Sequence, residues 1–101
     1  MLTGDFNAGE QYPAITYLKG ELTKEDNPIP LVDTFRICYP ESNEVGTFND
    51  FTGRTKGEKL DYVFVSKSTR VLNAAIIRAN KDGRYPSDHF PVTAHIQFKS
   101  E

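Results

Sequence analysis

The chain has 101 residues, with 38% hydrophobic and 26% charged side chains and a formal net charge of −2. This length allows one domain, and the composition is typical of a folded globular protein rather than a disordered or fibrous one. No apolar run approaches the roughly 20 residues of a membrane-spanning helix, and the first residues lack the basic and apolar regions of a secretory signal peptide. The single cysteine, Cys38, excludes an internal disulfide framework.

Charges are unevenly distributed along the chain. Residues 1–53 carry nine acidic and three basic side chains, which gives −6, whereas residues 54–84 carry eight basic and three acidic ones, which gives +5. A basic stretch of this kind can border an anionic substrate, because summed charge raises the local concentration of a counter-ion. Solvated loop and strand-edge charges are the more ordinary explanation.

The first half of the chain predicts short elements separated by turns. Residues 1–3 are extended in character and are followed by turn residues at 4–9. A short helix is expected over 13–20, because proline suits a first helical turn and glycine can end a helix. Residues 31–39 fit one or two further helical turns, with Cys38 on the apolar side as a small buried residue rather than a nucleophile.

Alternating patterns in the second half predict strands. Residues 59–66 place Tyr62 and Phe64 on one face and Asp61 on the other, beside two valines. Residues 71–78 are apolar on both faces, as in a strand that is covered on both sides. Residues 91–98 alternate cleanly, and their apolar face consists of Val92, Ala94, Ile96 and Phe98. His95 lies on the polar face and is expected to be a surface residue rather than a ligand or a base.

Short polar motifs could carry chemistry. In the motif GDFN at 4–7, Asp5 and Asn7 leave an extended backbone on the same face, although Asp-x-Asn after glycine is also typical of a turn that caps its own backbone. The motif SDH at 87–89 could likewise be only a turn. Asp61 lies on an apolar strand face, where an unpaired carboxylate is costly and a histidine is an economical partner. We therefore predict a carboxylate–imidazole hydrogen bond between Asp61 and His89.

The ordered set of motifs resembles the C-terminal half of the endonuclease/exonuclease/phosphatase superfamily, the metal-dependent phosphodiesterases that include deoxyribonuclease I and the apurinic endonucleases. The motifs are GDFN at 4–7, KLDYVFV at 59–65 and SDHFPV at 87–92, and GTF at 46–48 is also similar. The resemblance extends from residue 1 to residue 98. It implies an α+β fold that is half of a four-layer α/β/β/α sandwich, with one largely antiparallel sheet and helices on one face.

The resemblance also implies a role for each polar residue of the motifs. Asp5 matches the aspartate that positions and activates the attacking water, and Asn7 matches the side chain that steadies the phosphate. His89 matches the histidine at the scissile phosphate, acting as a proton shuttle or as a hydrogen-bond donor, and Asp61 matches the carboxylate that orients it. Asp88 matches an aspartate of the metal site.

An oxygen-rich donor set, formed by Asp5, Asn7 and Asp88, favours Mg²⁺ or Mn²⁺ over Zn²⁺. In the superfamily, the N-terminal half supplies a metal-binding glutamate, an asparagine and often a second histidine, and residues 1–101 do not include that half. We therefore interpret 1–101 as a truncated domain, the fragment of a phosphoesterase. Metal binding and activity of the isolated chain are expected to be weak or absent.

Two classes of function stay open at this point. The first is an enzyme fragment whose parent, a nuclease or a phosphatase, hydrolyses phosphate esters of nucleic acids, lipids or small molecules. The second is a non-catalytic association module that retains the motif residues. In either case, an apolar sheet face that the absent half would cover predicts a homodimer or higher assembly, formed sheet face to sheet face and burying more than about 1,200 Å².

Overall fold

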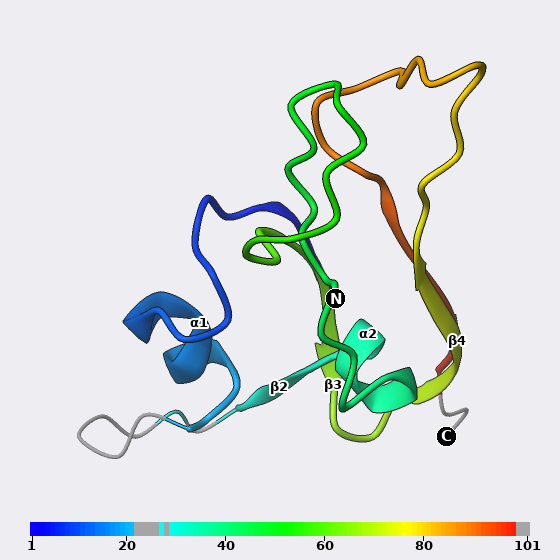
Figure 1. Ribbon diagram of the computed structural model, residues 1–101. Coiled ribbons are helices and arrows are strands. Elements are labelled where there is room, and N and C mark those ends of the chain that lie inside the picture. Colours follow the sequence, from blue (N-terminus) through cyan, green and yellow to red (C-terminus); the bar gives the residue numbers. More distant parts are fainter. Residues whose placement is uncertain (22–26, 28, 99–101) are drawn as a thin grey trace.

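The computed structural model describes residues 1–21, 27 and 29–98, which form five short strands and two short helices (Figure 1). The strands are β1 (Leu2–Asp5), β2 (Leu31–Asp33), β3 (Asp61–Ser66), β4 (Arg70–Ile76) and β5 (Val92–Gln97). The helices are α1 (Pro13–Leu18) and α2 (Thr34–Cys38). The predicted α+β class is confirmed. Within these ranges no helix has both the length and the apolar character to cross a membrane.

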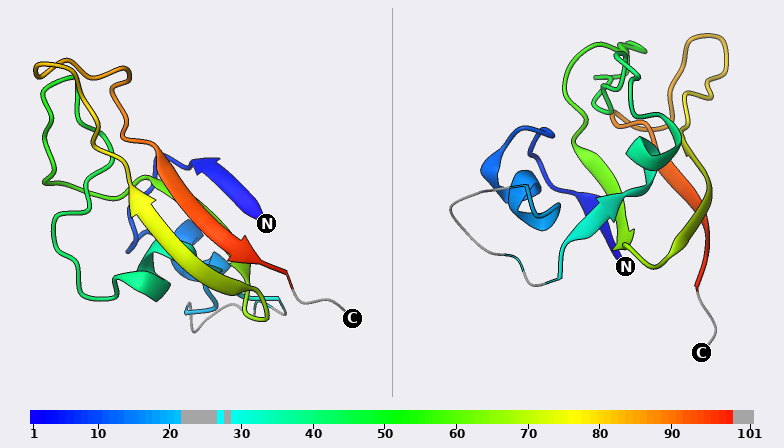
Figure 2. Two further views of the ribbon diagram at one scale, coloured as in Figure 1. Left: turned by 90° about the vertical axis from the view of Figure 1, so that its right-hand side faces the viewer. Right: turned by 90° about the horizontal axis from the view of Figure 1, so that it is seen from below.

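The strands form two antiparallel sheets instead of the single sheet that the sequence predicted. β3 is the central strand of a three-stranded sheet, with β1 on one edge and β2 on the other, while β4 pairs with β5. Because both edges of β3 are occupied, β5 contacts β3 but cannot extend its ladder. The β4–β5 ribbon therefore lies against the three-stranded sheet as a second unit (Figure 2).

The helices lie on opposite sides of β3 (Figures 1 and 2), which corrects the expectation that they share one face. On the α1 side, Ile15 packs with Tyr62 and Phe64, whose stacked rings have centroids 5.0 Å apart. On the α2 side, Phe35 packs with Val45 and Ala74 in a second cluster. The period-2 pattern of residues 59–66 correctly predicted which aromatic side chains share a face.

The segment predicted as helical over 31–39 begins as a strand. Leu31–Asp33 pairs with β3, and the helix starts only at Thr34. The reason is the Asp33 side chain, which accepts the Phe35 N–H at 3.0 Å and so caps the first turn of α2. Cys38, near the end of this helix, is half-buried against the second cluster.

The apolar face of β5 is partly covered by the α2 side of the molecule. Val92, Ala94 and Ile96 are half-buried, and Ala94 packs against the second cluster. His95 is exposed on the polar face, as predicted. Phe98 follows the strand and is 63% exposed. Assembly of two chains through this face stays a prediction.

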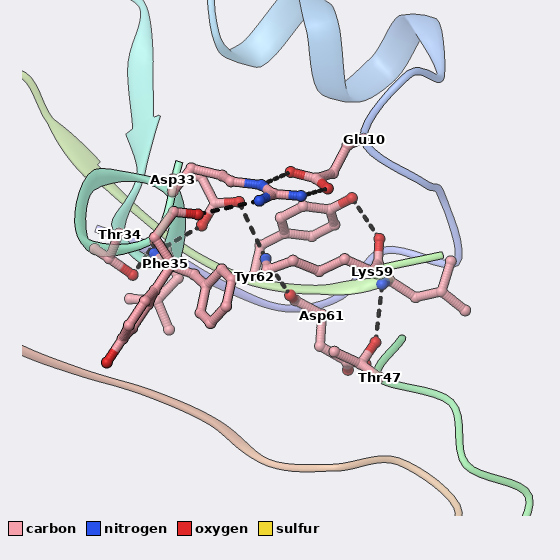
Figure 3. A network of polar contacts seen from close by, with 12 residues as sticks. Glu10, Asp33, Thr34, Phe35, Thr47, Lys59, Asp61 and Tyr62 are labelled. Atoms are coloured by element: carbon pink, nitrogen blue, oxygen red, sulfur yellow. Dashed lines mark hydrogen bonds and ion pairs between the residues drawn. The ribbon is translucent and has the colours of Figure 1, made fainter. Parts of the chain in front are cut away.

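A buried ion pair joins β2 to the segment that leads into β3 (Figure 3). The side chains of Lys59 and Asp33 are 0% and 1% exposed, and the Lys59 Nζ lies 3.1 Å from the Asp33 Oδ2. The ammonium also donates to the Asp61 carbonyl at 2.7 Å and stands 3.8 Å from the centroid of the Tyr62 ring. Burial lowers the pKa of Lys59, and the charge of Asp33 opposes that effect.

A second ion pair in the same network links α2 to the segment before α1 (Figure 3). The Arg36 Nε and Nη2 atoms each lie 2.8 Å from an oxygen of the Glu10 carboxylate, so the contact is bidentate. Burial alone would raise the pKa of Glu10, but the hydrogen bonds and charge of Arg36 lower it on balance. α2 is therefore connected through charged groups to the segment that leads into α1.

We expect Lys59→Met to destabilise the fold by about 3–5 kcal/mol, because it leaves the buried Asp33 carboxylate without its cation. Adding Asp33→Asn removes that charge while keeping a side chain that caps α2, so the double variant should recover much of the loss. Urea unfolding of the wild type and both variants at neutral pH measures the differences. Wild-type stability in Lys59→Met would contradict the inferred role of the ion pair.

Candidate functional site

Two carboxylates face each other across the end of the three-stranded sheet. Asp5 is the last residue of β1 and Asp61 is the first of β3, and they are direct partners in the antiparallel ladder. Side chains of directly paired residues leave the sheet on the same face, and like charges in that position repel. The pair therefore requires a positively charged or proton-donating group between or beside the two carboxylates.

His89 supplies this group. Its Nδ1 lies 2.7 Å from the Asp61 Oδ2, and its Nε2 lies 3.6 Å from the Asp5 Oδ2. The first distance confirms the predicted hydrogen bond between residues that are 28 positions apart. The Asp61 hydrogen bond is the main cause that raises the pKa of His89, and burial opposes it. The nearby charges of Asp61, Asp5 and Asp88 raise this pKa further.

Thr47 connects the two sides of this contact. Its carbonyl accepts the Phe90 N–H at 2.7 Å, and its hydroxyl accepts the Leu60 N–H at 2.9 Å. Phe90 follows His89 and Leu60 precedes Asp61, so one fully buried residue fixes the backbone beside both partners. Thr47 belongs to the GTF motif at 46–48, whose residue types alone do not indicate this role.

The motif that contains His89 is held along its length by the neighbouring segment. Phe48 and His89 form an isolated antiparallel bridge, with their rings edge to face at 5.4 Å between centroids. The Asn49 N–H donates to the Asp88 carbonyl at 2.6 Å, and its side-chain amide donates to the Ser87 carbonyl at 3.2 Å. Sequence reasoning missed Asn49, because nothing in its pattern marked it as a fully buried polar residue.

The GDFN motif combines both interpretations that the sequence left open. The Asp5 Oδ1 accepts the Asn7 N–H at 2.9 Å, which is the self-capping turn. The Asp5 Oδ2 is the oxygen that faces His89. Asn7 has a positive φ of 49°, which asparagine tolerates better than most residues, and its side chain is exposed.

The structure brings together three of the five predicted site residues as a compact group. Asp5, Asp61 and His89 each offer a ligand atom within 4.8 Å of the others, and all three line a pocket of about 350 Å³. Asp88 is half-buried beside the group, but among the described residues its carboxylate is outside that cluster of ligand atoms. The predicted grouping of Asp5, Asn7 and Asp88 around a metal ion stays a prediction.

These donors suit a hard cation in kind but not in number. Mg²⁺ takes six ligands, mostly oxygen, in near-octahedral geometry. Asp61 is engaged by His89, and one oxygen of Asp5 is engaged by the Asn7 backbone. The remaining oxygen of Asp5, together with Asn7 and Asp88, could supply part of a coordination shell. Residues 1–21, 27 and 29–98 do not by themselves complete a site for Mg²⁺.

Comparison with known proteins gives a structural relative. No protein-family model and no curated protein matches the chain. The fold is similar to the crystal structure of a functionally unknown conserved protein from Enterococcus faecalis V583, with a TM-score of 0.68 and 28% sequence identity. The match covers 97% of this chain and 36% of that one, so the chain spans about a third of the length of the protein it matches.

We expect His89 to titrate above pH 6.5, the ordinary pKa of histidine, because Asp61 holds its protonated form. Asp61→Asn keeps the side-chain size and removes the charge, so it should lower this pKa. NMR titration of the imidazole signals measures both proteins, and the His95 signal monitors any global effect of the substitution. Titration of wild-type His89 at or below pH 6.5 would show that the contact does not persist in solution.

The same pair should make stability depend on pH. The folded-state pKa of His89 is raised, so its contribution is fully present below the unfolded pKa, near 6.5, and is lost as pH rises through the folded value. Urea unfolding across this window should therefore show stability falling with increasing pH. In Asp61→Asn this fall should be smaller, and an unchanged pH profile would argue against the linkage.

Proposed function

We propose that this chain is the C-terminal half of a metal-dependent phosphoesterase of the endonuclease/exonuclease/phosphatase superfamily. The observation that carries the proposal is the Asp61–His89 hydrogen bond at the mouth of a pocket, with Asp5 at the second ring nitrogen. In this proposal the two sheets form one half of a four-layer α/β/β/α sandwich. The match to 36% of a longer protein is compatible with such a half.

The exposure of the three side chains supports different roles for them. Asp61 is 13% exposed and His89 is 23% exposed, whereas Asp5 is 40% exposed. Asp61 is thus shielded and occupied, as expected of a group that orients the imidazole rather than contacts a substrate. The Asp5 carboxylate and the His89 Nε2 are the groups that a phosphate ester bound in the pocket would contact.

The chemistry of phosphate-ester hydrolysis fits this arrangement. When His89 is neutral, Asp61 holds the proton on Nδ1 and leaves Nε2 able to accept a proton. When His89 is protonated, Nε2 can donate to a phosphate oxygen and stabilise the charge that develops there. The Asp5 carboxylate, 3.6 Å from Nε2, is placed to orient a water for attack on phosphorus.

The remaining motif residues have supporting roles in this proposal. Asn7 would steady the phosphate, and Asp88 would take part in a metal site with ligands from outside residues 1–101. A bound Mg²⁺ or Mn²⁺ would neutralise phosphate charge and lower the barrier to attack by water. Within this chain, Asp5 and Asp88 are the carboxylates available to hold such an ion.

The test is hydrolysis of bis(p-nitrophenyl) phosphate and p-nitrophenyl phosphate by the longest open reading frame that contains residues 1–101. We expect turnover that requires Mg²⁺ or Mn²⁺ and stops with chelator. His89→Ala should lower kcat by about 10²–10⁴-fold, the usual contribution of a general acid or base. Asp5→Ala and Asp88→Ala should also lower it severely.

His95→Ala is the matched control, because it removes an exposed histidine from the polar face of β5. Circular dichroism checks that each variant folds. The isolated chain should show little metal-dependent turnover and no micromolar affinity for Mg²⁺ in calorimetry. Absence of chelator-sensitive hydrolysis in the longer protein, or full activity of His89→Ala, would overturn the proposal.

A further inference from the structure

A basic surface lies at the same end of the molecule as His89 and is formed by two loops, 50–57 and 77–86. The loops are neighbours at this end of the molecule, and the second loop approaches the first near its C-terminal end (Figures 1 and 2). Tyr85 of the second loop packs so closely on Gly53 of the first that a Cβ there would clash with its ring. The Asn49 contacts to the backbone of Ser87 and Asp88 hold the loops together at their base.

The positive charge of this surface is exposed and not neutralised by ion pairs. Five cations stand on the two loops against two carboxylates, those of Asp50 and Asp82. The cations are Arg54, Lys56, Arg78, Lys81 and Arg84. Across the part of the chain that the structure describes, every ion pair involves other residues. The charge is therefore available to an anionic ligand.

Two of these cations are held side by side by a tight turn. The Lys81 N–H donates to the Arg84 carbonyl at 3.0 Å, and the Arg84 N–H donates to the Lys81 carbonyl at 2.9 Å. Asp82 and Gly83 between them have φ angles of 53° and 77°, as in a type I′ turn. Directly paired residues project on one side, and with Tyr85 these two cations line a pocket of about 390 Å³.

Phe51 adds an exposed aromatic ring to the first loop. Its side chain is 59% exposed, and its φ of 60° lies in a region that bulky side chains rarely adopt. The Phe51 N–H donates to the Asn49 Oδ1 at 2.7 Å, so a fully buried side chain imposes this conformation. Backbone strain of this kind persists only where the surroundings enforce it, and it is concentrated at functional sites.

We propose that these two loops bind single-stranded nucleic acid and deliver its phosphodiester to His89, an inference that rests on the proposed function and names its substrate class. The cations would follow the phosphates, and the Phe51 ring would stack on an unpaired base, as in single-strand binding proteins. Tyr85 precedes His89 by only four positions, at most about 14 Å of extended chain. A short strand bound on the loops therefore reaches the imidazole.

An anionic lipid surface is the weaker match to the same charges. Stable membrane-surface binding by a folded segment combines basic side chains with an apolar face that enters the lipid. The two loops expose only two large apolar side chains, Phe51 and Ile77, at 59% and 37%. Double-stranded DNA is also a weaker match, because its bases are already stacked on one another and leave no free face for the Phe51 ring.

The experiment is fluorescence anisotropy of the full chain with a labelled oligothymidylate of about 12 nucleotides, in chelator so that cleavage cannot occur. We expect binding that weakens steeply with salt. Lys81→Gln/Arg84→Gln should lower affinity and reduce the slope of log affinity against log salt by about 1.4. Phe51→Ala should weaken binding about tenfold, and Phe51→Tyr should retain it.

Matched controls are available at the other end of the molecule. Lys67→Gln/Arg70→Gln removes the same charge from the β3–β4 turn and the first residue of β4, and Phe98→Ala removes a ring that is 63% exposed. Neither should change affinity. Absence of oligothymidylate binding, equal losses in the control variants, or preferential binding to phosphatidylserine vesicles would each overturn the inference. Because anisotropy reports binding alone, hydrolysis of the generic diester without oligothymidylate binding would overturn only this inference. Binding without hydrolysis would overturn the proposed function, and with it the delivery of a phosphodiester to His89, while the nucleic-acid site on the loops would stand.

Discussion

The pairing of Asp5 with Asp61 across the β1–β3 ladder is the constraint on which the site depends. The register is set on the opposite face of β3, where Tyr62 and Phe64 are fully buried against α1. A shift of β1 by one residue would turn Phe6, which follows β1 and packs against both rings, away from this core. Hydrophobic packing on one face thereby forces like charges together on the other, and His89 relieves the repulsion.

Buried polar contacts also fix the position of the beginning of β3. Lys59 neutralises Asp33, and Asp33 in turn caps α2. The Lys59 ammonium also donates a hydrogen bond to the Asp61 carbonyl. The beginning of β3 is thus anchored by a buried charge immediately before the carboxylate that holds His89. Such an arrangement resists small displacements, because any movement of Asp61 would expose or unpair a group that is costly to leave without a partner.

Residue patterns predicted the faces of β3 and β5 and the Asp61–His89 contact, because alternation and an apolar setting for a carboxylate are local signals. The expectation that 71–78 is covered on both sides was wrong, since Leu72 and Ile77 are exposed. They did not predict that Lys59 would be buried, since a lysine at the start of a strand is usually exposed. The division of 31–39 depended on Asp33 acting as a cap, and the two-sheet arrangement depended on which edges of β3 were already filled. The positive φ of Phe51 depends on its hydrogen bond to the Asn49 side chain, so a pattern of residue types does not predict it.

The segment at 45–49 has a consequence for how this surface can change in evolution. Buried Thr47 and Asn49 in this segment form hydrogen bonds to the His89 motif and to the residue before β3. The loop tips at 50–57 and 80–84 face solvent. Insertions and substitutions are tolerated best at exposed tips. In related chains, these tips can therefore become longer or carry different charges and so bind different ligands. The geometry of His89, Asp61 and Asp5 would not change.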